Sequence, residues 1–225
     1  GYTTLVVEPV DGPTRYLGSM VTSHRSIENE HLRVEVQSNG GVRLVDKRAS
    51  GHTWDDLLTF EDRADIGDGW YHGVAVNDQV YTSAACGADV AVVADGIGKA
   101  TLRIAVTMNV PRAFDFRDMR RAEETAPLKI VSEVTLRKGS DRLEVTTTVD
   151  NAVLDHRLRV LLPTGLSGDT CCLADSAFDV VERKVALAPD NAKRKELDVE
   201  TRAQFTWTAF GDGRHGLAVV RRGRP

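Results

Sequence analysis

The sequence is poor in cysteine, in long apolar runs and in surplus positive charge. It has 3 cysteines in 225 residues, two of them adjacent at Cys171 and Cys172, which excludes a disulfide framework. No apolar run approaches the roughly 20 residues of a membrane-spanning helix. The formal net charge is −4, with 29 basic and 33 acidic side chains, and a general nucleic-acid binder would need a basic face. We therefore predict a cytoplasmic protein with no nucleic-acid and no membrane partner.

Motifs for the common catalytic and metal sites are also missing. The six histidines show no metal-ligand spacing, and the sequence contains no Walker loop and no serine nucleophile elbow. Gly211–Gly216 matches G-x-G-x-x-G, but the strand-like Leu217–Val220 follows it, which indicates a hairpin turn and not a phosphate loop. Asp155 and His156 are adjacent, so on a strand they would point to opposite faces and would not form a catalytic pair. From its residues alone, the chain shows no catalytic centre, no metal site and no cofactor site.

The alternation of residue types predicts an all-β protein. In Leu32–Gln37 and Leu143–Asp150, every second residue shares one apolar or β-branched face, the pattern of strands with one buried side. The charged segment Arg112–Glu124 is expected to form a short helix or a long exposed connection. We predict a single domain over residues 1–225, a large antiparallel β-sandwich cut from a longer chain. Further strands are expected at Leu5–Val10, Val42–Asp46, Val90–Ala94, Thr101–Val110, Lys129–Arg137, Leu158–Leu162, Phe178–Arg183, Phe205–Phe210 and Leu217–Val220.

The most unusual segment is acidic and aromatic and covers residues 54–72. Six carboxylates lie between positions 55 and 68, beside Trp54 and Trp70. Carboxylates hydrogen-bond sugar hydroxyls and aromatic rings pack on sugar faces, so the segment suits a polyol ligand. The alternatives are a solvated acidic loop, a calcium loop, for which the acidic spacing is wrong, and a carboxylate pair for glycoside hydrolysis. Composition alone favours the solvated loop.

A series of short segments, spread over nearly the whole chain, has the order and spacing of one known enzyme family. The segments are Gly1–Thr4, Ile27–Val36, Asn39–Gly41, Asp46–Arg48 with Gly51, Phe60–Asp62, Asp65–Asp68, Asn151 with Asp155–Arg159, Asp175–Arg183 and Gly216–Val219. Together they resemble the C-terminal β-domain of the bacterial α-mannosidases of glycoside hydrolase family 38.

The resemblance implies a function for the intact enzyme that this stretch does not perform alone. Family members carry a catalytic barrel with zinc, a helical bundle and then large β-sandwich domains related to the galactose mutarotase fold, and they hydrolyse α-mannosides with retention. None of the barrel motifs lies in these residues. We therefore expect a non-catalytic part with no metal of its own. Its partners would be the barrel and bundle of the same chain and an oligosaccharide or mannoside substrate.

The resemblance also implies rim contacts to the sugar, through Asp65, Asp68, Trp70 and Tyr71. The family pattern has tyrosine two residues after the second aspartate. Here Trp70 occupies that position and Tyr71 follows it, so which ring meets the sugar stays open. Two alternatives remain. One is a stand-alone carbohydrate-binding module. The other is a mutarotase-like enzyme that uses His72 or His156 with a carboxylate.

Overall fold

The computed structural model describes residues 2, 4, 6, 9, 18–48, 51–68, 70–166, 170–193, 201–202 and 204–221. The chain divides into two compact units, residues 1–163 and 164–225. Within the described residues the regular structure is β-strand apart from two 3-10 turns, η1 at Ser83–Ala85 and η2 at Asn191–Lys193, and every strand pair is antiparallel. The predicted all-β, antiparallel fold is confirmed. The expectation of one domain cut from a longer chain stays a prediction.

Unit 1 contains a five-stranded sheet whose strands follow one another in sequence order. Short turns connect them, as expected for an antiparallel meander. The expected strand at Val42–Asp46 is confirmed with the same bounds. The sheet consists of β1 (Val21–Ser23), β2 (Ser26–Glu28), β3 (Leu32–Val36), β4 (Val42–Asp46) and β5 (His52–Leu57).

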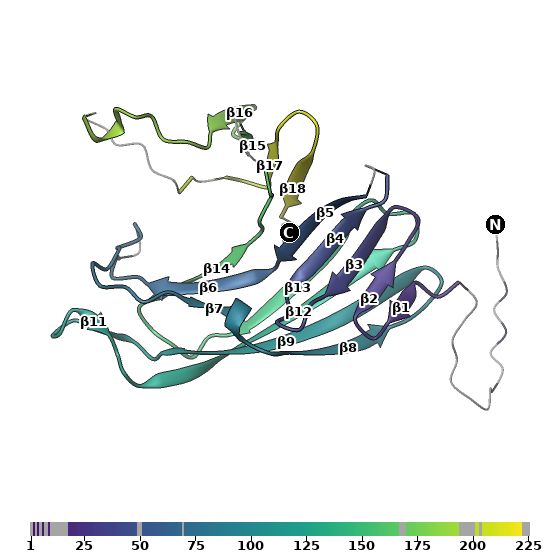
Figure 1. The fold of residues 1–225 in the computed structure, drawn as a ribbon, viewed down its shortest axis with the longest axis horizontal. Coiled ribbons are helices and arrows are strands. Elements are labelled where there is room, and N and C mark those ends of the chain that lie inside the picture. Colours follow the sequence, from purple (N-terminus) through teal and green to yellow (C-terminus); the bar gives the residue numbers. More distant parts are fainter. Residues whose placement is uncertain are drawn as a thin grey trace. The chain divides into compact units, whose positions relative to one another are not determined.

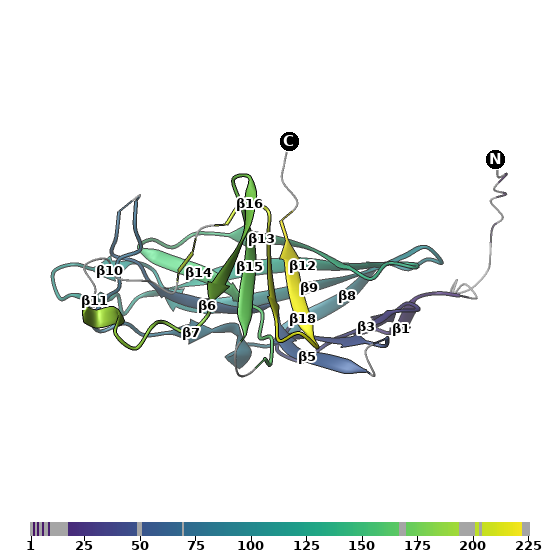
Figure 2. The same ribbon diagram turned by 90° about the horizontal axis from the view of Figure 1, so that it is seen from above.

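A second sheet of unit 1 contains the two longest strands, which pair along their full length (Figure 2). Alternate residues of this pair are buried, which is the period-two pattern that predicted them. The sheet has the order β13 (Leu143–Asp150), β12 (Thr125–Arg137), β9 (Lys99–Pro111) and β8 (Ala88–Ala94).

These two sheets lie as two layers with the core of unit 1 between them (Figure 1). Ile27 and Val34 from one sheet and Leu102 and Ile130 from the other are almost fully buried. The turn between β3 and β4 presses closely on β9, since a Cβ added to Gly40 would lie 2.8 Å from Val106 Cγ2. Gly40 also has a φ of +86°, so glycine is required there on both grounds.

Unit 1 also contains two smaller sheets. One has the order β14 (His156–Leu161), β6 (Thr59–Ala64) and β7 (Tyr81–Thr82), and the other is the ribbon β10 (Phe114–Asp115) and β11 (Arg120–Arg121). The segment Arg112–Glu124 is thus not a helix. It is a mostly exposed connection between β9 and β12, and its two sides pair as an antiparallel ribbon.

Unit 2 is a four-stranded sheet with the order β16 (Asp179–Lys184), β15 (Cys171–Ser176), β17 (Trp207–Gly211) and β18 (Gly216–Val220) (Figure 2). The literal G-x-G-x-x-G sequence is the turn between β17 and β18, which confirms the predicted hairpin. Asp175 fastens the start of β17 by accepting hydrogen bonds from the amides of Phe205, Thr206 and Trp207. Most of the expected strand at Leu5–Val10 lies outside the described residues, and the two that are described, Val6 and Pro9, are not in a strand.

Candidate functional site

The loop that follows β6 is closed at its base by Asp65. The Asp65 amide donates to the carbonyl of Asp155 at 2.9 Å. Its Oδ1 accepts hydrogen bonds from the amides of Gly67 and Gly73 at 3.0 and 2.9 Å, and its Oδ2 lies 3.1 Å from His72 Nδ1. Partial burial raises the pKa of Asp65, but the hydrogen bonds from Gly73, His72 and Gly67 outweigh it and hold the pKa below its usual value. The Asp65 carboxylate therefore holds the two ends of the loop together.

Asp68 orders the exposed tip of the same loop. Its Oδ1 accepts hydrogen bonds from the amides of Trp70 and Tyr71, at 2.8 and 3.3 Å. Trp70 is 93% exposed and Tyr71 is 66% exposed, which is far more than aromatic residues that pack in a core. The predicted sugar-contacting residues thus lie together on one short loop. Asp65 forms its base, Asp68 shapes its tip and the two rings face solvent.

The other carboxylates of segment 54–72 do not join this loop. Asp55 pairs with Arg43 on the neighbouring strand at 3.0 Å. Glu61 accepts hydrogen bonds from Arg63 and Arg159, and these outweigh the effect of partial burial and lower its pKa. The acidic run is therefore divided between several places: Asp55 and Glu61 pair with arginines on strands, and Asp65 and Asp68 lie on the loop.

Asp62 is the centre of a buried charged cluster that the sequence does not reveal. It is fully buried, with Oδ1 2.5 Å from Arg121 Nη2 and Oδ2 2.5 Å from His156 Nδ1. His156 Nε2 lies 3.0 Å from Asn151 Oδ1, and the Arg121 guanidinium lies 5.2 Å from the centre of the Tyr81 ring. The cluster joins β6, β7, β11 and β14 and so fixes the strands that carry the loop.

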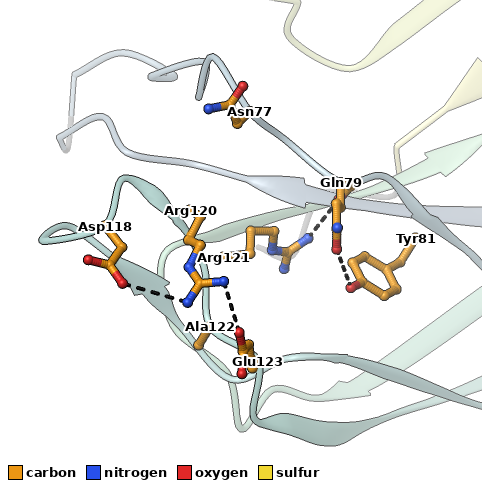
Figure 3. A pocket seen from close by; sticks show the side chains of 8 residues that line it. All are labelled: Asn77, Gln79, Tyr81, Asp118, Arg120, Arg121, Ala122 and Glu123. Atoms are coloured by element: carbon orange, nitrogen blue, oxygen red, sulfur yellow. Dashed lines mark hydrogen bonds and ion pairs between the residues drawn. The ribbon is translucent and has the colours of Figure 1, made fainter.

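Arg121 and Tyr81 of this cluster also line a cavity of about 520 Å³ (Figure 3). One side is formed by residues that follow the loop, and the other by the ribbon of β10 and β11. Arg121 belongs to both the buried cluster and the cavity wall, because Asp62 holds one end of its guanidinium. The cavity is lined by Asn77, Gln79, Tyr81, Asp118, Arg120, Arg121, Ala122 and Glu123.

The two histidines proposed for a mutarotase-like enzyme both contact carboxylates within the fold. His72 lies beside Asp65 at the base of the loop, and the His156 side chain is only 5% exposed beside Asp62. Asp155 contacts another partner, since its Oδ2 accepts the amide hydrogen of Phe114 at 3.2 Å. Asp155 and His156 therefore do not form a catalytic pair, as predicted. Neither His72 nor His156 lines the cavity.

Among the described residues, no group of three or more His, Cys, Asp or Glu side chains is placed to hold a metal ion. None of the helices in the described part of the chain has the length and apolar character needed to cross a membrane.

Comparisons with known proteins agree on one family. Residues 27–224 match the family model described as the glycosyl hydrolases family 38 C-terminal domain. A protein of Halalkalibacterium halodurans, provisionally named mannosylglycerate hydrolase, is 30% identical over 175 residues, which is 72% of this chain and 19% of that protein.

Two solved structures from Enterococcus faecalis share the fold. One is titled as an alpha-mannosidase, with a TM-score of 0.78 and 29% identity over 88% of this chain and 23% of that one. The other is titled as a protein in the glycosyl hydrolase family 38, with a TM-score of 0.76 and 29% identity over 89% of this chain and 24% of that one. The 225 residues thus span about a fifth to a quarter of these relatives.

Proposed function

Since this chain belongs to the C-terminal domain family of family 38 glycosyl hydrolases, we propose that it is the non-catalytic C-terminal part of a retaining, zinc-dependent α-mannosidase. In this proposal the zinc and the reacting carboxylates belong to a catalytic barrel outside these residues. The 225 residues support that barrel and contribute rim contacts to the mannoside.

The observation that carries the proposal is the ordered loop with two exposed aromatic rings. Trp70 and Tyr71 face solvent, yet the backbone beneath them is held by Asp65 and Asp68. A ring on a fixed backbone can pack on a sugar face at a low entropic cost, because ordering has already occurred on folding. Asp65 and Asp68 of the same loop carry carboxylates, which hydrogen-bond sugar hydroxyls. The loop is therefore suited to the rim of a sugar site.

A second observation supports docking of the catalytic part at this end of unit 1. The loops that meet around Phe114 carry large apolar side chains that are more than half exposed, although single exposed apolar residues are unremarkable. Such a concentration marks an interaction surface. The exposed side chains are Trp70, Tyr71, Val74, Val76, Phe116, Met119 and Leu154.

The test uses the full-length polypeptide that contains these residues and compares it with the 225-residue chain on an aryl α-mannoside and on mannosylglycerate. Both substrates follow from what the similar proteins are called. Zinc-dependent hydrolysis is expected from the full-length polypeptide alone. Asp68→Ala should lower kcat/KM about two- to twelvefold, the value of one neutral hydrogen bond of about 0.5–1.5 kcal/mol. Trp70→Ala should lower it as well.

Phe178→Ala is the matched control, because Phe178 is a fully exposed aromatic residue that does not belong to the loop. It should leave kcat/KM unchanged. Hydrolysis by the 225-residue chain alone would place a catalytic centre inside it and overturn the proposal. Unchanged kcat/KM in both Asp68→Ala and Trp70→Ala would place the loop outside the sugar site.

The exposed Trp70 also favours a second candidate, a stand-alone carbohydrate-binding module. That function predicts saturable quenching or enhancement of tryptophan fluorescence when mannose oligosaccharides are added to the 225-residue chain. It further predicts no hydrolysis by any longer form of the protein, which separates it from the first candidate.

A further inference from the structure

The cavity between residues 77–81 and the ribbon of β10 and β11 has the features of a built ligand site. Its volume of about 520 Å³ lies within the roughly 300–1,000 Å³ of small-molecule sites. Its back wall is fixed, because the Arg121 side chain is 3% exposed and is held by Asp62 and by the Gln79 carbonyl at 3.3 Å. The Arg121 guanidinium also covers one face of Tyr81.

The charges that line the cavity largely neutralise one another. Arg120 Nη1 lies 2.8 Å from Glu123 Oε1, and Arg120 Nη2 lies 3.6 Å from Asp118 Oδ2 (Figure 3). The other guanidinium, Arg121, is already paired with the buried Asp62. Two carboxylates therefore share one guanidinium at the mouth. An anionic ligand would meet repulsion there, and a neutral ligand would not.

Two amide side chains provide hydrogen-bonding groups on the opposite wall. Gln79 Oε1 accepts the Tyr81 hydroxyl at 2.9 Å, which leaves the Nε2 group of the same amide as a donor for a ligand (Figure 3). Asn77 forms no side-chain hydrogen bond with the residues that the structure describes, so its donors and acceptor are open to a ligand. Each primary amide offers two donors and one acceptor, which match the hydroxyls of a polyol.

From this geometry we propose that the cavity binds one neutral pyranose unit of a glycan, through Asn77, Gln79 and the carboxylates of Asp118 and Glu123. This subsite is separate from the loop of Asp65, Asp68, Trp70 and Tyr71. It goes beyond the proposed function, because binding here requires neither the catalytic barrel nor hydrolysis.

The experiment is a titration of the 225-residue chain with methyl α-mannoside, followed by isothermal calorimetry and by amide chemical shifts. Saturable binding is expected. Asn77→Ala and Gln79→Ala should each weaken it about two- to twelvefold, since each removes a hydrogen bond. A methyl uronide ligand, which replaces one hydroxymethyl group by a carboxylate, should bind more weakly than the neutral sugar because of Asp118 and Glu123.

Matched controls remove the same chemical groups elsewhere on the surface. Asn109 lies exposed on β9 and Gln204 is exposed in unit 2, so Asn109→Ala and Gln204→Ala should bind as tightly as the unmodified chain. The proposal is overturned if methyl α-mannoside shows no saturable binding. It is equally overturned if Asn77→Ala and Gln79→Ala bind normally, or if Trp70→Ala alone abolishes binding, since the sugar would then occupy the loop. None of these results depends on the activity of a longer polypeptide, so failure here leaves the proposed hydrolase function untouched.

Discussion

Replacing Asp62 should destabilise unit 1 far more than replacing a surface carboxylate. Asp62 is fully buried and its two oxygens lie 2.5 Å from Arg121 Nη2 and from His156 Nδ1. Asp62→Ala would leave the 3%-exposed Arg121 side chain without its carboxylate. Among the described residues, the Gln79 carbonyl and the Tyr81 ring would remain as its contacts. A buried guanidinium without a counter-ion is strongly unfavourable, because it has lost its water without gaining an opposite charge.

The expected cost is large relative to the whole stability of a domain. Breaking a buried ion pair by removing one partner costs about 3–5 kcal/mol, and domains of ordinary size are stable by about 5–15 kcal/mol. Removing both charges should cost less than the sum of the single losses, because the double variant leaves no orphaned Arg121. Contacting residues of this kind couple by about 0.5–3 kcal/mol.

The assay is urea unfolding of Asp62→Ala, Arg121→Ala and the double variant, followed by circular dichroism. Asp62→Asn, which keeps the side-chain shape, serves if Asp62→Ala does not fold. The control is Glu124→Ala. Glu124 is 69% exposed and pairs with Arg112 at 2.7 Å, so its loss should stay below about 1 kcal/mol. A loss for Asp62→Ala as small as that for Glu124→Ala, or strictly additive losses in the cycle, would refute the reasoning.

Three further variants or measurements test other parts of the fold. Gly40→Ala should lower the free energy of unfolding by about 1–3 kcal/mol more than Gly139→Ala. Both residues have positive φ, but only at Gly40 would the new Cβ meet a neighbour, Val106, at 2.8 Å. Asp65→Asn should destabilise the chain at neutral pH. Because the folded pKa of Asp65 is lowered, its contribution is complete above the unfolded value of about 3.9 and is lost as the pH falls through the lower folded value. Burial raises the pKa of Cys86, so its thiol should react with alkylating reagents at neutral pH more slowly than a free thiol.

Each of these expectations has a clear contrary result. Equal losses for Gly40→Ala and Gly139→Ala in urea unfolding would mean that the turn does not press on β9. A stability difference between Asp65→Asn and the unmodified chain that persists unchanged at pH 3 would mean that the Asp65 charge is not what holds the loop. For Cys86, alkylation in a Cys171→Ser, Cys172→Ser background at the rate of a free thiol would contradict its burial.

Strands with one covered face were predictable because their pattern is local. In Leu32–Gln37 and Lys129–Arg137 the buried residues alternate with exposed ones, so period two is visible without any tertiary information. The alternating face of Leu143–Asp150 was also placed correctly, on the same side as the buried residues of β12. Its Val145 is nevertheless 40% exposed, because an alternating pattern identifies a face and cannot say whether another layer covers it.

Strands β5 and β6 were missed because their charged residues conceal them. The stretch His52–Ala64 was interpreted with the acidic loop, yet Asp55 and Glu61 are strand residues whose charges pair with arginines of neighbouring strands. In strand β6 burial alternates from Phe60 to Ala64, but the buried Asp62 interrupts the apolar side of that pattern. A carboxylate is expected in a core only when a partner neutralises it, and that partner is distant in the sequence.

The family resemblance pointed to the loop residues, whereas the different structural roles of Asp65 and Asp68 are not visible in the sequence. Clustered aspartates and aromatics indicated segment 65–71, but only coordinates show that Asp65 closes the loop while Asp68 shapes its tip. The role of Arg121 depends on the pairing of β10 with β11 and on the approach of that ribbon to β6. Neither follows from residue spacing along the chain.

The position of Asp62 between the loop and the cavity limits which variants can report on sugar binding. Asp62 lies on the strand that leads into the loop, and it holds Arg121, the back wall of the cavity. An Asp62 variant would therefore disturb both proposed sugar sites through the fold, and a loss of binding would not identify a contact. The side chains of Asn77 and Gln79 line the cavity, and Gln79→Ala keeps the backbone carbonyl that accepts from Arg121, whereas Trp70 lies on the loop. A sugar that loses affinity in Asn77→Ala and Gln79→Ala but not in Trp70→Ala binds in the cavity, and the reverse pattern places it on the loop. An Asp62 variant cannot make this distinction.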